Sequence, residues 1–277
     1  MSKTGSDASR MRFGDFELRR EIGRGGMGTV YEAWQRSLQR VVALKIMGGH
    51  VSSSSTAVLR FQREAQAAAK LQHSNIIPIS AHGDEEGVYY YAMEYVQGRS
   101  LNHVIAEFRA TAGLEVREPD AAETIAIDRS GGSTKSEKTS SEVKSSGGTA
   151  TSPSASGNVV LSAPSSSHRA SEHFRFVAQH MAAVADALEY AHKRGVIHRD
   201  IKPHNLILGD DGRIRVSDFG LARLMEQPGV TMTGEVIGSP LYMAPEQIAG
   251  GPGAADHRAD IYSLGATMYE WIALIPP

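Results

Sequence analysis

Two polar clusters beside a short predicted hairpin constrain this chain more than any other feature. Apolar runs at 206–208 and 214–216 are joined by Gly-Asp-Asp-Gly at 209–212, a pattern that predicts two strands and a tight turn. Because a hairpin brings its two ends together, we expect the polar residues at 198–205 to lie beside those at 218–220.

The side chains of the two clusters suit metal and phosphate chemistry. Asp200 and Asp218 are carboxylates, Asn205 is an amide and Lys202 is an ammonium. Oxygen donors suit a divalent cation such as Mg²⁺, and an ammonium suits a phosphate. A solvated polar loop explains any one of these residues taken alone, but it explains the ordered set poorly.

The order of these residues resembles the catalytic signature of protein kinases. His-Arg-Asp begins at His198, Asn205 follows the aspartate by five positions, and Asp-Phe-Gly begins at Asp218. Lys202 followed by proline resembles the serine/threonine branch. The resemblance covers 16–108 and 173–277, and Gly-Ser-Pro-Leu-Tyr-Met-Ala-Pro-Glu-Gln is closest to eukaryotic-like (Hanks-type) bacterial kinases.

The resemblance implies a two-lobed α+β fold. We expect an N-terminal lobe at 13–96, made of an antiparallel sheet and one helix, and a mostly helical C-terminal lobe at 97–277. The implied activity is ATP-dependent transfer of the γ-phosphate to serine and threonine hydroxyls of proteins. The implied cofactors are ATP and Mg²⁺, with Asp200 and Lys202 as catalytic residues and Asn205 and Asp218 as metal ligands.

A glycine-rich segment at 23–28 lies between two runs with strand character. Gly-x-Gly-x-x-Gly also occurs in dinucleotide-binding folds, but there it opens a helix. Strand-like residues follow here, which disfavours a Rossmann dehydrogenase, and a flexible hairpin tip is the plainer alternative. By resemblance we expect a flap over the nucleotide, formed by Ile22, Gly23, Arg24, Gly25, Gly26, Met27, Gly28, Thr29 and Val30.

One lysine interrupts the apolar run at 41–46, which is predicted as a strand. A charge inside such a run is costly unless it is paired or reaches water at a sheet edge. The resemblance implies that Lys45 contacts the α- and β-phosphates and pairs with Glu64 on a helix predicted at 59–71. An exposed Glu64 that pairs with Arg60 is the alternative.

The run at 88–96 is predicted as the last strand of the first lobe and the hinge that follows it. The resemblance places Met93 at the back of the adenine pocket and the backbone of Glu94 and Val96 at the adenine edge. Ala43 completes the expected nucleotide-binding set. A buried core strand explains the same residues equally well.

The segment at about 109–171 is rich in Ser, Thr and Gly and poor in large apolar residues. Such a segment cannot bury enough surface to offset its ordering entropy, so we expect a disordered insertion. We expect residues 1–12 to be a disordered lead-in. The helix predicted at 174–192 carries an apolar stripe that indicates core packing, formed by Val177, Met181, Val184, Leu188 and Ala191.

Two segments after the hairpin also resemble kinase elements. Thr231 and Thr233 lie where an activation loop is expected, and we expect self-phosphorylation of one of them, with Arg199 as the partner of the phosphate. Residues 260–265 resemble a buried helix that anchors the catalytic loop. Kinase domains continue beyond this point, so we expect a truncated C-terminal lobe with uncovered apolar surface and an unpartnered Glu246.

The alternative function is an inactive, truncated pseudokinase that binds nucleotide or acts as a scaffold. The net charge of −2 gives no argument for nucleic acid or a membrane surface, and the first 12 residues lack the apolar core of a signal peptide. The chain has no cysteine, which excludes disulfides and fits the reducing cytoplasm. Protein substrates are the expected partners.

Overall fold

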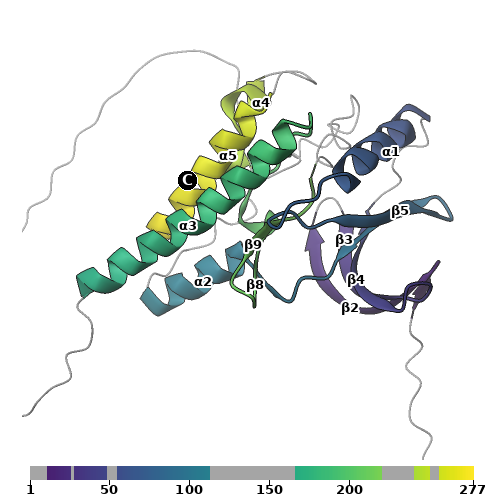
Figure 1. Cartoon of the computed structure of the whole chain (residues 1–277), viewed down its shortest axis with the longest axis horizontal. Coiled ribbons are helices and arrows are strands. Elements are labelled where there is room, and N and C mark those ends of the chain that lie inside the picture. The colour runs from purple at the N-terminus through teal and green to yellow at the C-terminus, as the bar shows by residue number, and fades with distance from the viewer. Residues whose placement is uncertain (1–10, 26–27, 49–54, 113–165, 220–239, 250–255) are drawn as a thin grey trace, which may run out of the picture.

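The computed structural model describes residues 11–25, 28–48, 55–112, 166–219, 240–249 and 256–277. These residues form one part made of an antiparallel sheet with a helix beside it, and a second part that is mostly helical (Figure 1). The arrangement confirms the predicted two-lobed α+β class. Predictions on Gly26, Met27, Thr231 and Thr233 lie outside the described residues.

The N-terminal lobe is built on a six-stranded sheet with the order β1-β2-β3-β4-β6-β5. All its neighbouring strands are antiparallel. Helix α1 (Ser55–Ala69) packs against β5. The strands are β1 (Arg12–Phe13), β2 (Phe16–Gly25), β3 (Gly28–Gln35), β4 (Arg40–Met47), β5 (Ile79–Glu85) and β6 (Val88–Glu94).

The two faces of this sheet bury different sets of side chains. Leu44 and Ala92, which are cross-strand neighbours, belong to a small cluster on one face. Ala43 and Met93 are the adjacent pair and belong to the main core that continues into the C-terminal lobe. Since successive strand residues alternate between faces, Lys45 shares the face of Ala43 and points toward the second lobe.

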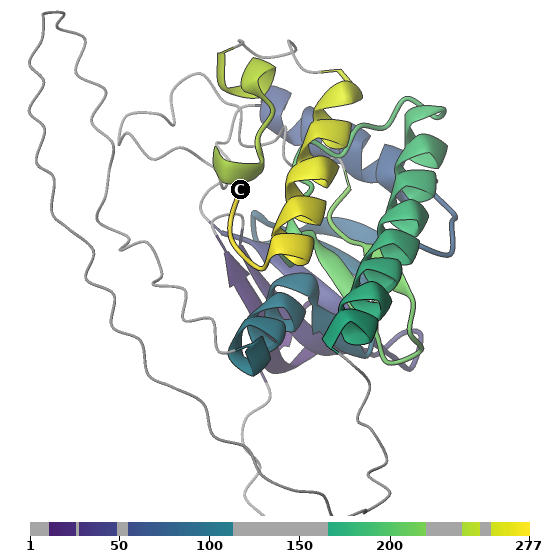
Figure 2. The ribbon, with the colours of Figure 1, turned by 90° about the vertical axis from the view of Figure 1, so that its left-hand side faces the viewer.

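The C-terminal lobe contains a small three-stranded sheet, β7-β8-β9, and helices that lie beside it. Helices α3 and α5 run side by side (Figure 2). The elements are β7 (Gly98–Ser100), α2 (Leu101–Ala112), α3 (Ser166–His192), η1 (Pro203–Asn205), β8 (Leu206–Gly209), β9 (Ile214–Val216), η4 (Pro240–Tyr242), α4 (Pro245–Ala249) and α5 (Arg258–Ala273).

Two sequence predictions for this lobe are confirmed. Strands β8 and β9 pair antiparallel with Leu206 opposite Val216, which is the predicted hairpin. The predicted stripe of α3 is buried, with no member more than 4% exposed. Burial of this stripe fixes the helix against the core, so the loop that follows α3 starts from a rigid support.

Helices α2 and α3 both extend into the segment expected to be irregular at about 109–171. Helix α2 ends at Ala112, and α3 begins at Ser166. Arg109 explains the longer α2: its guanidinium pairs with Glu270 at 2.8 Å and donates to the carbonyl of Leu274 at 2.6 Å. These contacts hold the last turn of α2 against α5. Residues 113–165 lie outside the described part of the chain.

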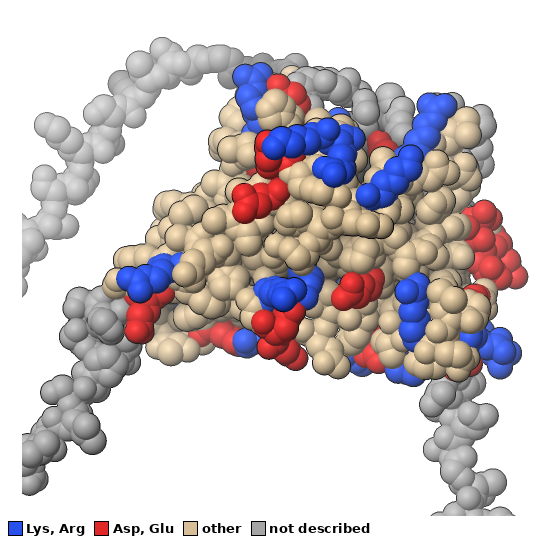
Figure 3. Space-filling model, viewed as in Figure 1, with Lys and Arg blue, Asp and Glu red and all other residues tan. Residues whose placement is uncertain are grey.

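One face of α5 exposes apolar side chains. Ile261, Tyr262 and Tyr269 are each about half exposed and line an open groove together with Pro277. Basic and acidic side chains are intermixed on the face seen in Figure 3, in keeping with the near-zero net charge. Within the described ranges, no helix is both long enough and apolar enough to cross a bilayer.

Candidate active site

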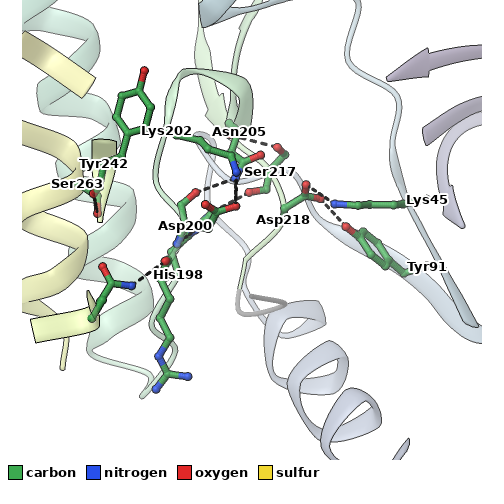
Figure 4. A network of polar contacts seen from close by, with 12 residues as sticks. Lys45, Tyr91, His198, Asp200, Lys202, Asn205, Ser217, Asp218, Tyr242 and Ser263 are labelled. Carbon is green, nitrogen blue, oxygen red and sulfur yellow. Dashed lines mark hydrogen bonds and ion pairs between the residues drawn. The ribbon is translucent and has the colours of Figure 1, made fainter. Parts of the chain in front are cut away.

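The β8–β9 hairpin brings the two polar clusters of the sequence together (Figure 4). The backbone N–H of Ser217 donates to the carbonyl of Asn205 at 2.9 Å, and the Ser217 hydroxyl donates to the same carbonyl at 3.2 Å. The loop before β8 and the loop after β9 are therefore fixed to each other. This confirms the predicted proximity of residues 198–205 to residues 218–219, whose Phe219 ring also lies 4.8 Å from the ring of His198.

Asp200 is held by two residues of its own loop. Its Oδ2 accepts a hydrogen bond from the Asn205 amide at 3.0 Å and lies 2.9 Å from the Lys202 ammonium. The Asn205 amide nitrogen also donates to the Asp200 carbonyl at 2.7 Å. The amide nitrogen is thus engaged on the Asp200 side, and the amide oxygen is left to face another group.

Asp260 of α5 holds the backbone of the loop at 198–205 in place. It is fully buried and accepts the backbone N–H groups of His198 and Arg199 at 2.8 and 2.7 Å. His192 lies 2.7 Å from the same carboxylate. The anchor stabilises a positive φ of 68° at Arg199, a conformation uncommon outside glycine. Asp260 thus supports this loop as predicted, although Ile261 and Tyr262, in the helix expected to be buried, are about half exposed.

The environment of Asp260 favours its charged form. Burial alone would raise the pKa of this carboxyl. The hydrogen bond from His192, the charge of His198 and the two backbone N–H groups outweigh burial and lower the pKa below its ordinary value. Asp260 is therefore an ionised side chain that is tied to backbone, and its contacts make it a structural residue.

Asp218, in contrast, is held by residues of the other lobe. The Lys45 ammonium on β4 lies 2.7 Å from Oδ2, and the Tyr91 hydroxyl on β6 donates to Oδ1 at 2.5 Å. Asp218 has a positive φ of 62°. The structure thus brings Lys45 and Asp218, which are 173 positions apart in the chain, into one partly buried ion pair.

The expected partner of Lys45 is corrected by this pair. Lys45 was predicted to pair with Glu64, but the ion pair that it forms within the described part of the chain is with Asp218. The Lys45 side chain is 8% exposed and that of Asp218 is 14% exposed, so each charge offsets the cost of burying the other. Glu64 lies on α1, and its role toward the nucleotide stays a prediction.

The charges around Asp218 also set its protonation. Burial would raise the pKa of this carboxyl, but the charge of Lys45 and the hydrogen bonds from Lys45 and Tyr91 outweigh burial and lower it. Burial, followed by the nearby charge of Asp218, raises the pKa of Tyr91 well above its ordinary value. Asp218 is thus an ionised acceptor, and Tyr91 keeps its proton as a donor.

The predicted glycine flap is a hairpin between β2 and β3. Gly25 pairs with Gly28, so strand follows strand and no helix begins, which removes the dinucleotide-fold interpretation. Gly28 has a φ of 137°, and a Cβ there would lie 2.2 Å from the Ile46 carbonyl oxygen. A Cβ at Gly25 would meet nothing within 4 Å, so the backbone there is open to approach by another group.

The remaining residues of the expected nucleotide set come from neighbouring strands. Val30, Ala43 and Met93 contact or belong to the main core, on the same side of the sheet as Lys45. The backbone N–H of Glu94 donates to the carbonyl of Pro78 at 3.2 Å. Ile22, Gly23, Arg24 and Thr29 lie along β2 and β3, and Val96 follows β6. Contact of these residues with a nucleotide stays a prediction.

Sequence reasoning missed Tyr91 as a member of the site. The signal for it is the strand register, in which Tyr91 lies directly opposite Lys45. Three consecutive tyrosines at 89–91 hide that signal, because the sequence does not say which of them faces the lysine. His198 was also missed as a structural member: its ring nitrogen Nε2 lies 2.7 Å from the carbonyl of Ser217.

The available donors fit a magnesium ion that is bound together with phosphates. Asp218 offers carboxylate oxygens, and Asn205 offers its amide oxygen. No group of three or more histidine, aspartate or glutamate side chains suited to a metal occurs among the residues that the structure describes. Mg²⁺ is usually bound by one or two carboxylates plus substrate phosphates, so this small donor set is appropriate.

Comparison with known proteins gives consistent matches. Residues 16–275 match the family model described as protein tyrosine and serine/threonine kinase. Serine/threonine-protein kinase PrkC of Bacillus subtilis is 31% identical over 93% of this chain and 30% of the relative. Serine/threonine-protein kinase PknJ of Mycobacterium tuberculosis is 33% identical over 93% of this chain and 34% of the relative. The chain thus spans about a third of the length of these curated relatives.

Solved structures agree with this match. The crystal structure of the Mycobacterium tuberculosis PknI kinase domain is similar, with a TM-score of 0.60, 27% identity, and coverage of 98% of this chain and 78% of that one. Family model, relatives and fold all point to the same group. The chain belongs to the protein kinase family, and it resembles the bacterial serine/threonine kinases of that family.

Proposed function

We propose that this chain transfers the γ-phosphate of ATP to serine or threonine hydroxyls of proteins. One observation carries the proposal: a largely buried network joins Asp200, Lys202 and Asn205 to the Asp218–Lys45 pair through Ser217, with side-chain exposures of 8–17% for the charged members. An acid that can orient a hydroxyl therefore lies beside a carboxylate and an ammonium suited to a metal-bound triphosphate.

Asp200 is the residue that handles the proton. Its Oδ2 is occupied by Asn205 and Lys202, so Oδ1 is the oxygen that accepts the hydroxyl proton of the substrate. The hydroxyl oxygen bonds to the γ-phosphorus while the bond from that phosphorus to the bridging oxygen of ADP breaks. The proton passes to Asp200 and then to solvent. Correct placement of the two reactants supplies most of the acceleration.

The cationic side chains hold the phosphates in place. Lys202 lies beside Asp200 and would face the transferring group, while Lys45 would orient the α- and β-phosphates. Asn205 and Asp218 would hold Mg²⁺, which when bound offsets the negative charge of the phosphates. The glycine hairpin and the residues at Ala43, Met93, Glu94 and Val96 enclose the nucleotide.

The decisive test is phosphate transfer from labelled ATP to a generic basic protein in the presence of Mg²⁺, with nucleotide binding measured in parallel. Asp200→Asn is the test variant, and Asp210→Asn, in the exposed hairpin turn, is the matched control. We expect transfer by the unaltered chain and the control but not by Asp200→Asn. Nucleotide binding without transfer by the unaltered chain would contradict the proposal and favour the pseudokinase alternative.

We also propose that the domain acts on protein substrates in the cytoplasm and phosphorylates itself at Thr231 or Thr233. The absence of cysteine from the chain is in keeping with a reducing compartment. The presence of Arg199 beside Asp200 supports self-phosphorylation. A phosphate in that segment would pair with the guanidinium of Arg199. Mass spectrometry after incubation with ATP tests it: a double Thr→Ala variant should lose the phosphate and turn over more slowly.

A further inference from the structure

Tyr91 is a fully buried tyrosine that contacts the charged pair of the candidate active site. It lies on β6 directly opposite Lys45 on β4. Residues that face each other across an antiparallel pair point to the same side of the sheet. Tyr91 and Lys45 therefore reach Asp218 together, as Figure 4 shows.

The two strands hold different oxygens of one carboxylate. The Tyr91 hydroxyl donates to Oδ1 of Asp218 at 2.5 Å, and the Lys45 ammonium lies 2.7 Å from Oδ2. The ammonium also lies 5.8 Å from the centre of the Tyr91 ring. The carboxylate is thus fixed at both ends, and its plane cannot rotate without breaking one of the two contacts.

The two contacts respond differently to a bound cation. Lys45 and a divalent cation carry charges of the same sign, so they compete for Asp218. The phenol is neutral, so its hydrogen bond to Oδ1 meets no such competition. Asp218 also has a φ of 62°, which a non-glycine residue rarely adopts, and it therefore needs a restraint that persists.

We propose that Tyr91 is a positioning residue for the metal-binding carboxylate: its hydroxyl keeps Asp218 oriented when Lys45 turns from Asp218 to the phosphates. This inference rests on the proposed function, because it assigns Asp218 to magnesium. Tyr91 touches neither the metal nor the substrate. It acts through Asp218, as partners that hydrogen-bond to metal ligands do.

The test separates metal-dependent from metal-independent nucleotide binding. Calorimetry measures the affinity of the full chain for a non-hydrolysable ATP analogue with and without MgCl₂. For Tyr91→Phe we expect the affinity gained on adding Mg²⁺ to fall by about 10-fold or more, the range typical for loss of such a partner. Affinity without Mg²⁺ should stay the same, because the phenol does not reach the phosphates.

Tyr90→Phe is the matched control. Tyr90 is the adjacent residue of β6, and its ring packs against Phe13 and Phe16 on the other face of the sheet. The Tyr90→Phe variant also removes one tyrosine hydroxyl from β6, but on the face of the sheet away from Asp218. It should therefore keep the full response to Mg²⁺. A second test variant, Tyr91→Met, fills the space without a donor and should behave as Tyr91→Phe does, which keeps the test decisive if one variant fails to fold.

An unchanged or larger gain on adding Mg²⁺ to Tyr91→Phe, or an equal loss with and without Mg²⁺, would overturn the inference. These results would leave the proposed function intact as long as the unaltered chain binds the nucleotide more tightly with Mg²⁺ and transfers phosphate. If the unaltered chain does neither, the proposed function fails and the inference fails with it.

Discussion

The two carboxylates of the site are built in different ways. Asp200 is held by Lys202 and Asn205, two and five positions further along the same loop. Asp218 is held by Lys45 and Tyr91, which are 173 and 127 positions away on the sheet of the other lobe. Local chain geometry therefore assembles the first carboxylate, and only the packing of the two lobes assembles the second.

This difference separates the two halves of the proposed reaction. The Asp200 side handles the hydroxyl and is carried on one rigid loop, anchored on α5 through Asp260. The Asp218 side would handle the nucleotide, and its contacts depend on the packing of the two lobes against each other. The following substitutions test whether the two sides are separable, from the largest expected effect to the smallest.

The largest effect is expected for Asp200→Asn. Loss of the proton acceptor should lower the rate of phosphate transfer by about 10²- to 10⁴-fold, the range for removal of a general base. Affinity for a non-hydrolysable ATP analogue with Mg²⁺ should change little, because Asp218 and Lys45 are untouched and an asparagine carbonyl oxygen at position 200 can still accept the hydrogen bond from the Asn205 amide. Asp218→Asn should lose both properties. Steady-state kinetics and calorimetry on the two variants measure this, and a parallel loss of affinity in Asp200→Asn would break the comparison.

Asp260→Asn should destabilise the loop that carries Asp200, because Asp260 accepts hydrogen bonds from the backbone of that loop. An amide has a single acceptor oxygen, so it cannot serve His198, Arg199 and His192 together. We expect the free energy of unfolding to fall by about 3 kcal/mol, near the lower end for breaking a buried charged contact. Denaturant unfolding at neutral pH measures the loss. Asp256→Asn, at an aspartate before α5 whose side chain is about half exposed, is the control and should have no comparable effect.

The stability difference between the original chain and Asp260→Asn should also depend on pH. The folded-state pKa of Asp260 is lowered, so the stability that it contributes is present above the usual pKa of 3.8 and is lost as pH falls through the lower folded value. The difference between the original chain and Asp260→Asn should therefore be constant near neutral pH and shrink below about pH 4. A difference that grows on acidification would contradict the assigned ionised state.

Lys45→Met and Lys202→Met compare the two ammonium groups directly. The side chain of Lys45 is 8% exposed and that of Lys202 is 17% exposed, so losing the more buried charge should cost more. We expect a loss of about 2 kcal/mol in unfolding free energy for Lys45→Met and about 1 kcal/mol for Lys202→Met. Lys45→Met should weaken nucleotide affinity, and Lys202→Met should mainly lower the transfer rate. If the two variants lowered nucleotide affinity equally, the Asp200 side and the Asp218 side would not be separable.

The smallest effect is expected at the hairpin turn. Asp211 and Arg215 form a well-aligned surface pair at 2.6 Å, which lowers the pKa of Asp211 to about 2, chiefly through the hydrogen bond from Arg215. Exposed pairs contribute little because water competes for both charges. Asp211→Asn should leave the denaturant midpoint and the transfer rate unchanged. A clear loss would mean that this hairpin depends on its surface charges more than on its buried residues.

Sequence alone determined the elements whose signal is local. The β8–β9 hairpin followed from its turn residues, and the apolar stripe of α3 followed from its helical spacing; both are present as predicted. The partners of Asp200 lie within five positions of it, so the sequence places them near the carboxylate before any tertiary contact is considered. Periodicity and turn chemistry act over a few residues, and that is the range that a sequence reports.

The tertiary structure decided the contacts that depend on register and on packing between the lobes. It paired Lys45 with Asp218 rather than with Glu64, placed Tyr91 against that pair, and extended α2 through the contacts of Arg109 with α5. A shift of one residue in the β4–β6 register would turn Tyr91 to the opposite face, and no local property of the three tyrosines excludes it. Lys45, Asp218 and Tyr91 satisfy one another's charges and hydrogen bonds only when the two lobes pack together. The sequence of either lobe alone therefore does not specify this arrangement.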